Sequence, residues 1–226
     1  MAPEPVAEVF ARNLGSLTAG QQQTLQASTV AVIGCGGLGG FVVEELARLG
    51  IGELRICDPD RFDTTNINRQ LYAGSATLGR SKAETAARRI REIHDHCTAH
   101  GYADTFQQVG KELLTGAELA CDCLDSPVDR LELGALCAEQ QIPLVHGAVD
   151  RWYGQVAVLS PGSTLLHELY RGKQKIHAPP SVPVPVAALV ASLQVNEICK
   201  LLLGMESQLM DTWMSIDLQR LTFDIF

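Results

Sequence analysis

Long apolar runs and a signal-peptide pattern are missing from this sequence. No apolar run reaches the roughly 18 residues that a membrane-spanning helix needs. The start, MAPEPVAEVFARNLG, does not place a basic region before a hydrophobic one, as secretory signal peptides do. Low-complexity tracts and blocks of like charge are also missing. These absences predict a folded cytoplasmic protein that does not act at a membrane.

Basic residues are in deficit. The chain has 18 Lys and Arg against 26 Asp and Glu, a formal net charge of −8. A surface of this sign argues against a general nucleic-acid-binding role, because the nucleic-acid backbone is itself anionic. Small molecules and proteins are therefore the favoured partners.

The cysteine pattern of a disulfide framework is absent as well. The seven cysteines are an odd number and are scattered through apparent strands and helices. Such cysteines behave as small buried apolar side chains. We therefore expect them to pack in the core.

Strand-like and helix-like stretches alternate up to about residue 150. The length of 226 residues suits one sizeable core, and a single domain over 1–226 is expected. Alternation with short connections is typical of a parallel sheet covered on both faces. Strands are expected at 29–34, 53–58, 118–125 and 142–149, with a weaker one at 98–103, and helices at 38–50, 79–94 and 126–141.

The remaining segments do not follow this alternation. About 1–27 is expected to form an N-terminal arm and helix. About 166–184 is polar, proline-rich and without a period, which predicts a flexible crossover loop. A strand and turn at 152–162, a largely buried helix at 184–204 and two closing strands within 212–226 complete the chain.

A glycine motif follows the first predicted strand. Gly34, Gly36 and Gly39 form G-x-G-x-x-G, and Asp58 closes the next strand about 20 residues later. Glycines let backbone N–H groups reach a phosphate, and Asp58 can accept hydrogen bonds from ribose hydroxyls. NAD, FAD, S-adenosylmethionine and ATP all use such a motif, so it predicts a nucleotide without naming it. The fold class is therefore α/β: a Rossmann-like doubly wound sheet, mostly parallel, with antiparallel C-terminal strands.

Amide and cationic side chains gather in the stretch 58–84. Asn66, Arg69, Gln70 and Lys82 lie there, a set for which NAD enzymes have no general use. Arg69 can offer a planar fork to phosphate oxygens and Lys82 a point charge, so the set suits a polyphosphate. The alternative is that these side chains are ordinary surface charges on a loop and a helix.

Six stretches, taken in order, resemble the ThiF/MoeB/HesA adenylyltransferases, the bacterial relatives of ubiquitin-activating enzymes. The resemblance covers nearly the whole chain from about Arg12 onward. The stretches are GCGGLGG, CDPDRFDTTNINRQLY, LGRSKAE, CDCLDS, YGQVAV and VAALVASLQVNEICKLLLG.

The resemblance implies roles for individual residues. Asp125 would bind Mg²⁺ beside the ATP phosphates, and Arg12 would reach the phosphates of a partner subunit, which implies a homodimer. Arg69 and Lys82 would stabilise the reacting phosphate, so the catalytic set is Arg69, Lys82, Asp125 and Arg12. The nucleotide-binding set is Gly34, Gly36, Gly37, Gly39, Asp58, Asp60, Asn66, Arg69, Gln70 and Lys82.

The resemblance also implies a reaction. The C-terminal carboxylate of a small ubiquitin-like protein ending in Gly-Gly would attack the α-phosphorus of ATP, forming an acyl adenylate and releasing pyrophosphate. Residues 165–185 contain no cysteine, so thiolate transfer by this chain is doubtful and a separate sulfur donor protein is implied. The sequence does not name the carboxylate substrate or its pathway.

Other functions stay open at this stage. One is a dehydratase that adenylates a carboxylate on modified tRNA, and only this alternative makes tRNA a partner. Another is a small NAD-binding oxidoreductase, which would leave Arg69, Lys82 and Asp125 without a role. A third is a nucleotide-binding regulatory module that has lost catalysis.

Zinc content tests one departure from the family pattern. Many relatives hold a structural zinc with two C-x-x-C pairs, and this sequence contains neither pair. Structural zinc needs four nitrogen or sulfur ligands, so we expect protein purified without chelator to contain well under one zinc per chain by elemental analysis. A stoichiometric amount would contradict this expectation.

Overall fold

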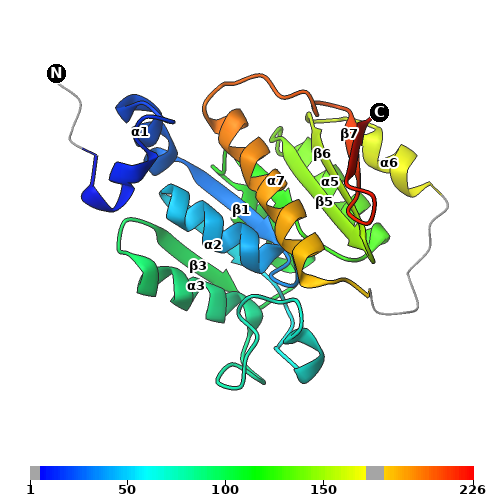
Figure 1. Ribbon diagram of the computed structural model, residues 1–226, viewed down its shortest axis with the longest axis horizontal. Coiled ribbons are helices and arrows are strands. Elements are labelled where there is room, and N and C mark those ends of the chain that lie inside the picture. Colours follow the sequence, from blue (N-terminus) through cyan, green and yellow to red (C-terminus); the bar gives the residue numbers. More distant parts are fainter. Residues whose placement is uncertain (1–5, 172–180) are drawn as a thin grey trace.

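The computed structural model describes residues 6–171 and 181–226, which form an eight-stranded sheet with helices on both faces (Figure 1). The strand order is β3-β2-β1-β4-β5-β6-β7-β8. The strands are β1 Thr29–Ile33, β2 Glu53–Cys57, β3 Thr98–Tyr102, β4 Leu119–Asp122, β5 Leu144–Asp150, β6 Tyr153–Leu159, β7 Trp213–Asp217 and β8 Thr222–Ile225. The helices are α1 Ala19–Ala27, α2 Gly39–Leu49, α3 Lys82–Ile93, α4 Phe106–Leu114, α5 Pro127–Glu139, α6 Leu165–Tyr170 and α7 Val184–Leu202, with 3-10 turns η1 Glu8–Asn13 and η2 Thr64–Asn66.

The sheet has a parallel part and an antiparallel part. β3, β2, β1, β4 and β5 run parallel, whereas β6, β7 and β8 are antiparallel to their neighbours. The weaker strand candidate at 98–103 is present as β3. The predicted fold class, an α/β Rossmann-like sheet with antiparallel C-terminal strands, is confirmed.

Two helices differ from the sequence prediction. α4 was not predicted, because it is short and Gly110 lies inside it, which weakens a helical pattern. α6 occupies the start of the stretch expected to be a crossover loop. Leu166 and Tyr170, one turn apart, are both buried in the core on the α5 side of the sheet, and this burial supports the helix. Residues 172–180 of the expected loop lie outside the described residues.

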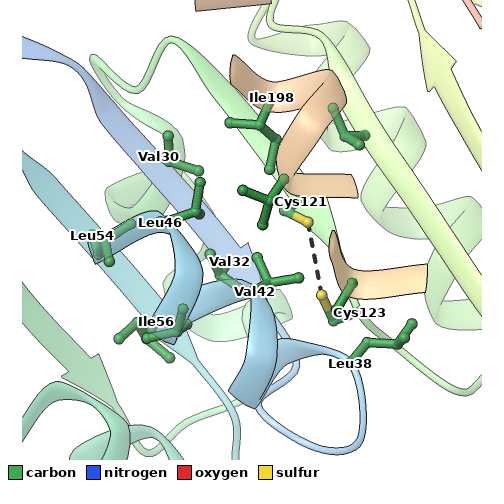
Figure 2. Packing of buried hydrophobic residues seen from close by; sticks show 14 of the residues in the cluster. Val30, Val32, Leu38, Val42, Leu46, Leu54, Ile56, Cys121, Cys123 and Ile198 are labelled. Carbon is green, nitrogen blue, oxygen red and sulfur yellow. Dashed lines mark hydrogen bonds between the residues drawn. The ribbon is translucent and has the colours of Figure 1, made fainter. Parts of the chain in front are cut away.

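Two cores lie on opposite faces of the sheet, because successive strand residues point to opposite sides. Val30 and Val32 of β1 belong to one core, with side chains from α2, α3 and α7. Ala31 and Ile33 belong to the other, with side chains from α4, α5 and α6. Figure 2 shows the first core, where Leu46 of α2 lies close to the β1 side chains.

α7 is a core helix. Within the described residues it is the one helix long and apolar enough to cross a membrane by length and composition. In the folded chain it packs against β4, β5, β6 and α2, and Val186, Val190 and Ile198 are fully buried. Burial inside the domain accounts for its apolar composition.

The turn between β1 and α2 depends on two close backbone approaches. Gly34 has a φ of +92°, and a Cβ there would lie 2.7 Å from the carbonyl oxygen of Cys123. A Cβ on Gly39 would overlap the carbonyl oxygen of Gly34. Both positions therefore require glycine, and together they let α2 begin directly above the end of β1.

Substitution of Gly39 tests this packing. Because a Cβ at residue 39 meets rigid backbone, Gly39→Ala should cost about 1–3 kcal/mol of unfolding free energy, as overpacking does elsewhere. The melting temperature should then fall by roughly 2–4 °C per kcal/mol for a chain of this size. Gly74→Ala is the matched control, since nothing lies within 4 Å of a Cβ at that position. Equal melting temperatures for the two variants would contradict the close approach at Gly39.

Candidate nucleotide-binding site

The candidate site lies at the carboxyl ends of β1, β2 and β4. β1 pairs with β2 on one side and with β4 on the other, so the strand order reverses at β1. In open α/β sheets, ligands bind outside the carboxyl ends of the strands where the strand order reverses in this way. The loops and helix starts that follow these three strands carry every predicted site residue except Arg12.

Asp58 holds the glycine loop against the end of β2. Its Oδ2 accepts the backbone N–H of Cys35 at 2.7 Å, and its Oδ1 accepts the backbone N–H of Asp60 at 2.8 Å. Burial raises the pKa of the Asp58 carboxyl, and the positive charge of Lys82 opposes that rise. Asp58 thus has a structural role in addition to the ribose contact predicted for it.

The segment around Gln70 faces the glycine loop. A Cβ on Gly36 would lie 3.6 Å from Nε2 of Gln70, and a Cβ on Gly37 would lie 3.9 Å from Cγ of Arg69. Gln70 is buried, and its Oε1 has no hydrogen-bond partner within the described residues. A buried amide oxygen without a partner beside bare backbone fits a polar ligand that enters between the two segments.

Asn66 shapes this segment from inside. Its side chain is buried, and its Oδ1 accepts the backbone N–H of Asp63 at 3.2 Å, while the Asp63 carboxylate accepts the N–H of Thr65. This reciprocal pair closes η2 as a capping box. Arg69 and Gln70 follow this turn closely in the chain, so the turn positions them.

The two predicted cations, Arg69 and Lys82, are both anchored by neighbouring groups of the chain. Lys82 is the first residue of α3, is buried, and donates to Oδ2 of Asp60 at 2.8 Å. Arg69 is half-buried and donates from Nη1 to the carbonyl oxygen of Thr65 at 2.9 Å and to Oδ1 of Asn68 at 3.0 Å. Both side chains are therefore held in place by neighbours within the same 58–84 stretch.

Asp125 is an exposed carboxylate in the loop after β4. β4 ends at Asp122 rather than at 125 as predicted, because the chain turns there to start α5, whose first turn is capped by Ser126. The loop passes the glycine turn, since a Cβ on Gly34 would lie 3.3 Å from the backbone nitrogen of Leu124. Asp125 makes no hydrogen bond or ion pair within the described residues.

Arg12 does not join this site within its own chain. It is exposed on η1, and the neighbouring Asn13 donates to the carbonyl oxygen of Leu49 at 3.3 Å. Leu49 is the last residue of α2, whereas the glycine loop precedes the first. An 11-residue helix is about 16 Å long, so Arg12 lies about that far from the glycine loop, toward the amino ends of the parallel strands.

A buried polar network beside the site was missed by the sequence analysis. His146 of β5 stands opposite Asp122 of β4, and its Nδ1 lies 2.7 Å from Oδ2 of Asp122. Arg130, Gln155 and Tyr170 complete the network. The sequence did carry a signal for this network, because Asp122 and His146 each interrupt an apolar stretch that is predicted to be a strand.

Six of the seven cysteines are buried, as predicted, and Cys199 is half-buried. Burial raises the pKa of the Cys57, Cys97 and Cys137 thiols to about 12, and burial also raises that of Cys35 well above its ordinary value. Such thiols stay protonated near neutral pH. Cys121 of β4 and Cys123, which follows the strand, lie in the core with their sulfurs 3.7 Å apart (Figure 2). In residues 6–171 and 181–226, no group of three or more His, Cys, Asp or Glu side chains is placed to hold a metal ion.

The amino-acid sequence of this chain is similar to those of several known proteins. The ThiF family model matches residues 10–226. The molybdopterin-synthase adenylyltransferase of Salmonella typhimurium is 32% identical over 187 residues, which cover 80% of this chain and 75% of the relative. The SAMP-activating enzyme E1 of Haloferax volcanii is 29% identical, over 90% of this chain and 77% of the relative. The tRNA threonylcarbamoyladenosine dehydratase of Bacillus subtilis is 34% identical, over 63% of this chain and 58% of the relative.

Solved structures match the fold. The crystal structure of E. coli MccB with ATP superposes with a TM-score of 0.83 at 19% identity, covering 98% of this chain and 71% of that one. The structure of PaaA gives a TM-score of 0.75 at 21% identity, covering 91% of this chain and 65% of that one. The chain therefore belongs to the ThiF family, and the domain it forms is an ATP-dependent adenylyltransferase.

Proposed function

We propose that the protein adenylates the C-terminal carboxylate of a small ubiquitin-like sulfur-carrier protein that ends in Gly-Gly. The observation that carries this proposal is the meeting of the glycine loop, the Gln70 segment, Lys82 and Asp125 at the carboxyl ends of three neighbouring strands. The relatives named above support the substrate class, since one is a molybdopterin-synthase adenylyltransferase and another a SAMP-activating enzyme.

The residues suit the substrate ATP. N–H groups of the glycine loop and the start of α2 present partial positive charge to phosphate oxygens, and the buried Gln70 amide offers a further polar contact. Arg69 and Lys82 neutralise a polyphosphate from either side, and Lys82 can leave Asp60, whose side chain is 67% exposed to water. Asp58, which accepts a hydrogen bond from the glycine loop, suits a ribose contact.

A bound Mg²⁺ would neutralise phosphate charge and orient the phosphate groups for in-line displacement. Asp125 is the residue that would hold it. Magnesium is commonly bound by one or two carboxylates together with substrate phosphates, so one exposed carboxylate beside the glycine loop suits this ion.

The reaction needs no nucleophile from the enzyme. A carboxylate oxygen of the substrate protein bonds to the α-phosphorus of ATP, the bond to the bridging oxygen breaks, and pyrophosphate leaves with that electron pair. Both reactants are anions, so their positioning between Arg69 and Lys82 lowers the barrier. Raised thiol pKa values support a separate protein as the sulfur donor.

A homodimer is part of the proposal. Arg12 lies about one helix length from the glycine loop of its own chain, so it can meet a triphosphate only at the site of a second copy. The expected outcome is a dimer in which each copy supplies Arg12 to its partner.

The second candidate is a tRNA threonylcarbamoyladenosine dehydratase-like activity. The similarity to the Bacillus subtilis dehydratase favours it, whereas the net charge of −8 weighs against a tRNA-binding surface. Radiolabelled pyrophosphate exchange into ATP separates the two candidates. Exchange that depends on a Gly-Gly protein supports the first, and exchange that depends on modified tRNA supports the second.

Ligand choice gives the first functional prediction. ATP with Mg²⁺ should stabilise the native state by mass action, about 2.7 kcal/mol at 100 times Kd. That corresponds to a rise in melting temperature on the order of 5–10 °C. NAD should raise it less. A clear shift with NAD and none with ATP would rule out the adenylyltransferase site.

Exchange kinetics give the second functional prediction. Lys82→Ala and Asp125→Ala should each lower pyrophosphate exchange by on the order of 100-fold or more, because each removes a preorganised charge. Cys199→Ser is the control, since Cys199 is half-buried in α7 and takes no part in the proposed step. Circular dichroism confirms folding. A folded Cys199→Ser variant without exchange, beside a fully active Lys82→Ala, would overturn the role assignments.

A further inference from the structure

Leu124, the residue before Asp125, is held through both of its backbone polar groups. The backbone N–H of Leu124 donates to Oδ1 of Asp122 at 2.9 Å, and the carbonyl oxygen of Leu124 accepts from Nη2 of Arg130 at 2.5 Å. These two contacts hold the two successive peptide groups on either side of the Leu124 Cα, the second of which joins Leu124 to Asp125. They therefore restrict the direction in which the Asp125 side chain leaves the backbone.

Arg130 is positioned by the hydroxyl group of Tyr170. Nη1 of Arg130 donates to that hydroxyl at 2.8 Å, and the guanidinium lies 5.1 Å from the centroid of the tyrosine ring. Both side chains are only 6% exposed, so water contributes little to holding the guanidinium. Tyr170 is the last residue of α6, which makes α6 part of the support for the loop after β4.

The same hydroxyl is also linked, through His146, to Asp122, which accepts the Leu124 N–H. It lies 3.0 Å from Nε2 of His146, whose Nδ1 lies 2.7 Å from the Asp122 carboxylate. Nε2 of Gln155 lies 2.9 Å from the same Nε2 of His146. With Nδ1–H donating to Asp122, Nε2 is left as an acceptor for the hydroxyl and the amide, which is the pattern of a neutral imidazole.

Packing alone does not require this arrangement. Burying a carboxylate and a guanidinium 3.8 Å apart carries a desolvation cost that apolar residues of similar volume would avoid. The two groups instead converge on the backbone of one residue, Leu124. Partners behind a metal ligand commonly fix its orientation in the same way.

We propose that Arg130 and Tyr170 are positioning residues that aim the Asp125 carboxylate at a divalent cation, a role that rests on the proposed function. His146 and Gln155 support them by holding Asp122 and the tyrosine hydroxyl. Neither Arg130 nor Tyr170 contacts ATP or the metal. Their loss therefore weakens the contribution of Mg²⁺ to ATP binding and leaves metal-free ATP binding unchanged.

Calorimetric titration of ATP, once with Mg²⁺ and once with EDTA, measures that contribution as the ratio of the two Kd values. Wild-type protein should bind ATP more tightly with Mg²⁺ than with EDTA, and we call this increase in affinity the Mg²⁺ gain. The variant Asp125→Asn should lose the Mg²⁺ gain. Tyr170→Phe should reduce the gain by about 10-fold, the usual effect of removing a partner behind a metal ligand. Its Kd for ATP in EDTA should match that of wild type.

A double variant tests whether Tyr170 acts through Asp125. In Asp125→Asn the carboxylate is already gone, so adding Tyr170→Phe should reduce the Mg²⁺ gain no further. A purely structural role for the hydroxyl would instead leave the Mg²⁺ gain of the single variant Tyr170→Phe at the wild-type value. It would also weaken ATP binding equally in Mg²⁺ and in EDTA.

Arg130→Lys is the second test, and Arg55→Lys is its matched control. Arg55 also uses its guanidinium to bind backbone carbonyl oxygens, those of Glu112, Leu113 and Thr115, but it does so at the end of α4. Both variants should lower the melting temperature. Only Arg130→Lys should reduce the Mg²⁺ gain.

The outcomes separate the two levels of the proposal. Wild-type protein that does not bind ATP contradicts the proposed function itself. An Mg²⁺ gain that depends on Asp125 but survives in both Tyr170→Phe and Arg130→Lys overturns the positioning role alone. Equal loss of the gain in Arg130→Lys and Arg55→Lys overturns it as well.

Discussion

The carboxylate of Asp58 is the interaction on which the arrangement of the site depends. It accepts the N–H of Cys35 from the glycine loop and the N–H of Asp60 from the segment that carries the cations. Because Asp58 and Cys35 are both buried, water cannot replace the bond between them, and losing it would leave a buried donor unsatisfied. One side chain thus fixes the distance between the loop that receives a phosphate and the segment that neutralises it.

A second buried carboxylate has a parallel role on the other side of β1. Asp122 is the last residue of β4, and Asp58 is the first residue after β2. Both strands pair with β1. Asp58 accepts the backbone N–H of Asp60, in the segment that continues to Lys82. Asp122 accepts the backbone N–H of Leu124, the residue before Asp125. Each carboxylate lies near a buried cation, Lys82 in the first case and Arg130 in the second, so that neither charge is buried alone. The chain has a net charge of −8, and Arg69 and Lys82, the cations that suit a polyphosphate, lie in the segment whose start Asp58 holds.

Much of the candidate site was predictable because it lies in short, contiguous stretches. The spacing of Gly34, Gly36 and Gly39 reports a strand-to-helix turn that only glycine permits, and the structure contains that turn. The stretch around Asn66 and Gln70 was predicted near a nucleotide, and it faces the glycine loop. The ligand roles of these residues, of Asp125 and of Arg12 remain predictions.

The sequence by itself determined the order of the strands and of the helices other than α4 and α6, the glycine turn and the residue types near it, since each depends on local periodicity or on spacing within one segment. Only the tertiary structure decided that Asp122, Arg130, His146 and Tyr170 meet around the peptide before Asp125, and that Arg12 lies about a helix length from the site of its own chain. These relations join residues from different strands and helices, with up to 48 positions between Asp122 and Tyr170. Their proximity depends on strand order and helix packing, which local patterns constrain too weakly to define individual side-chain contacts.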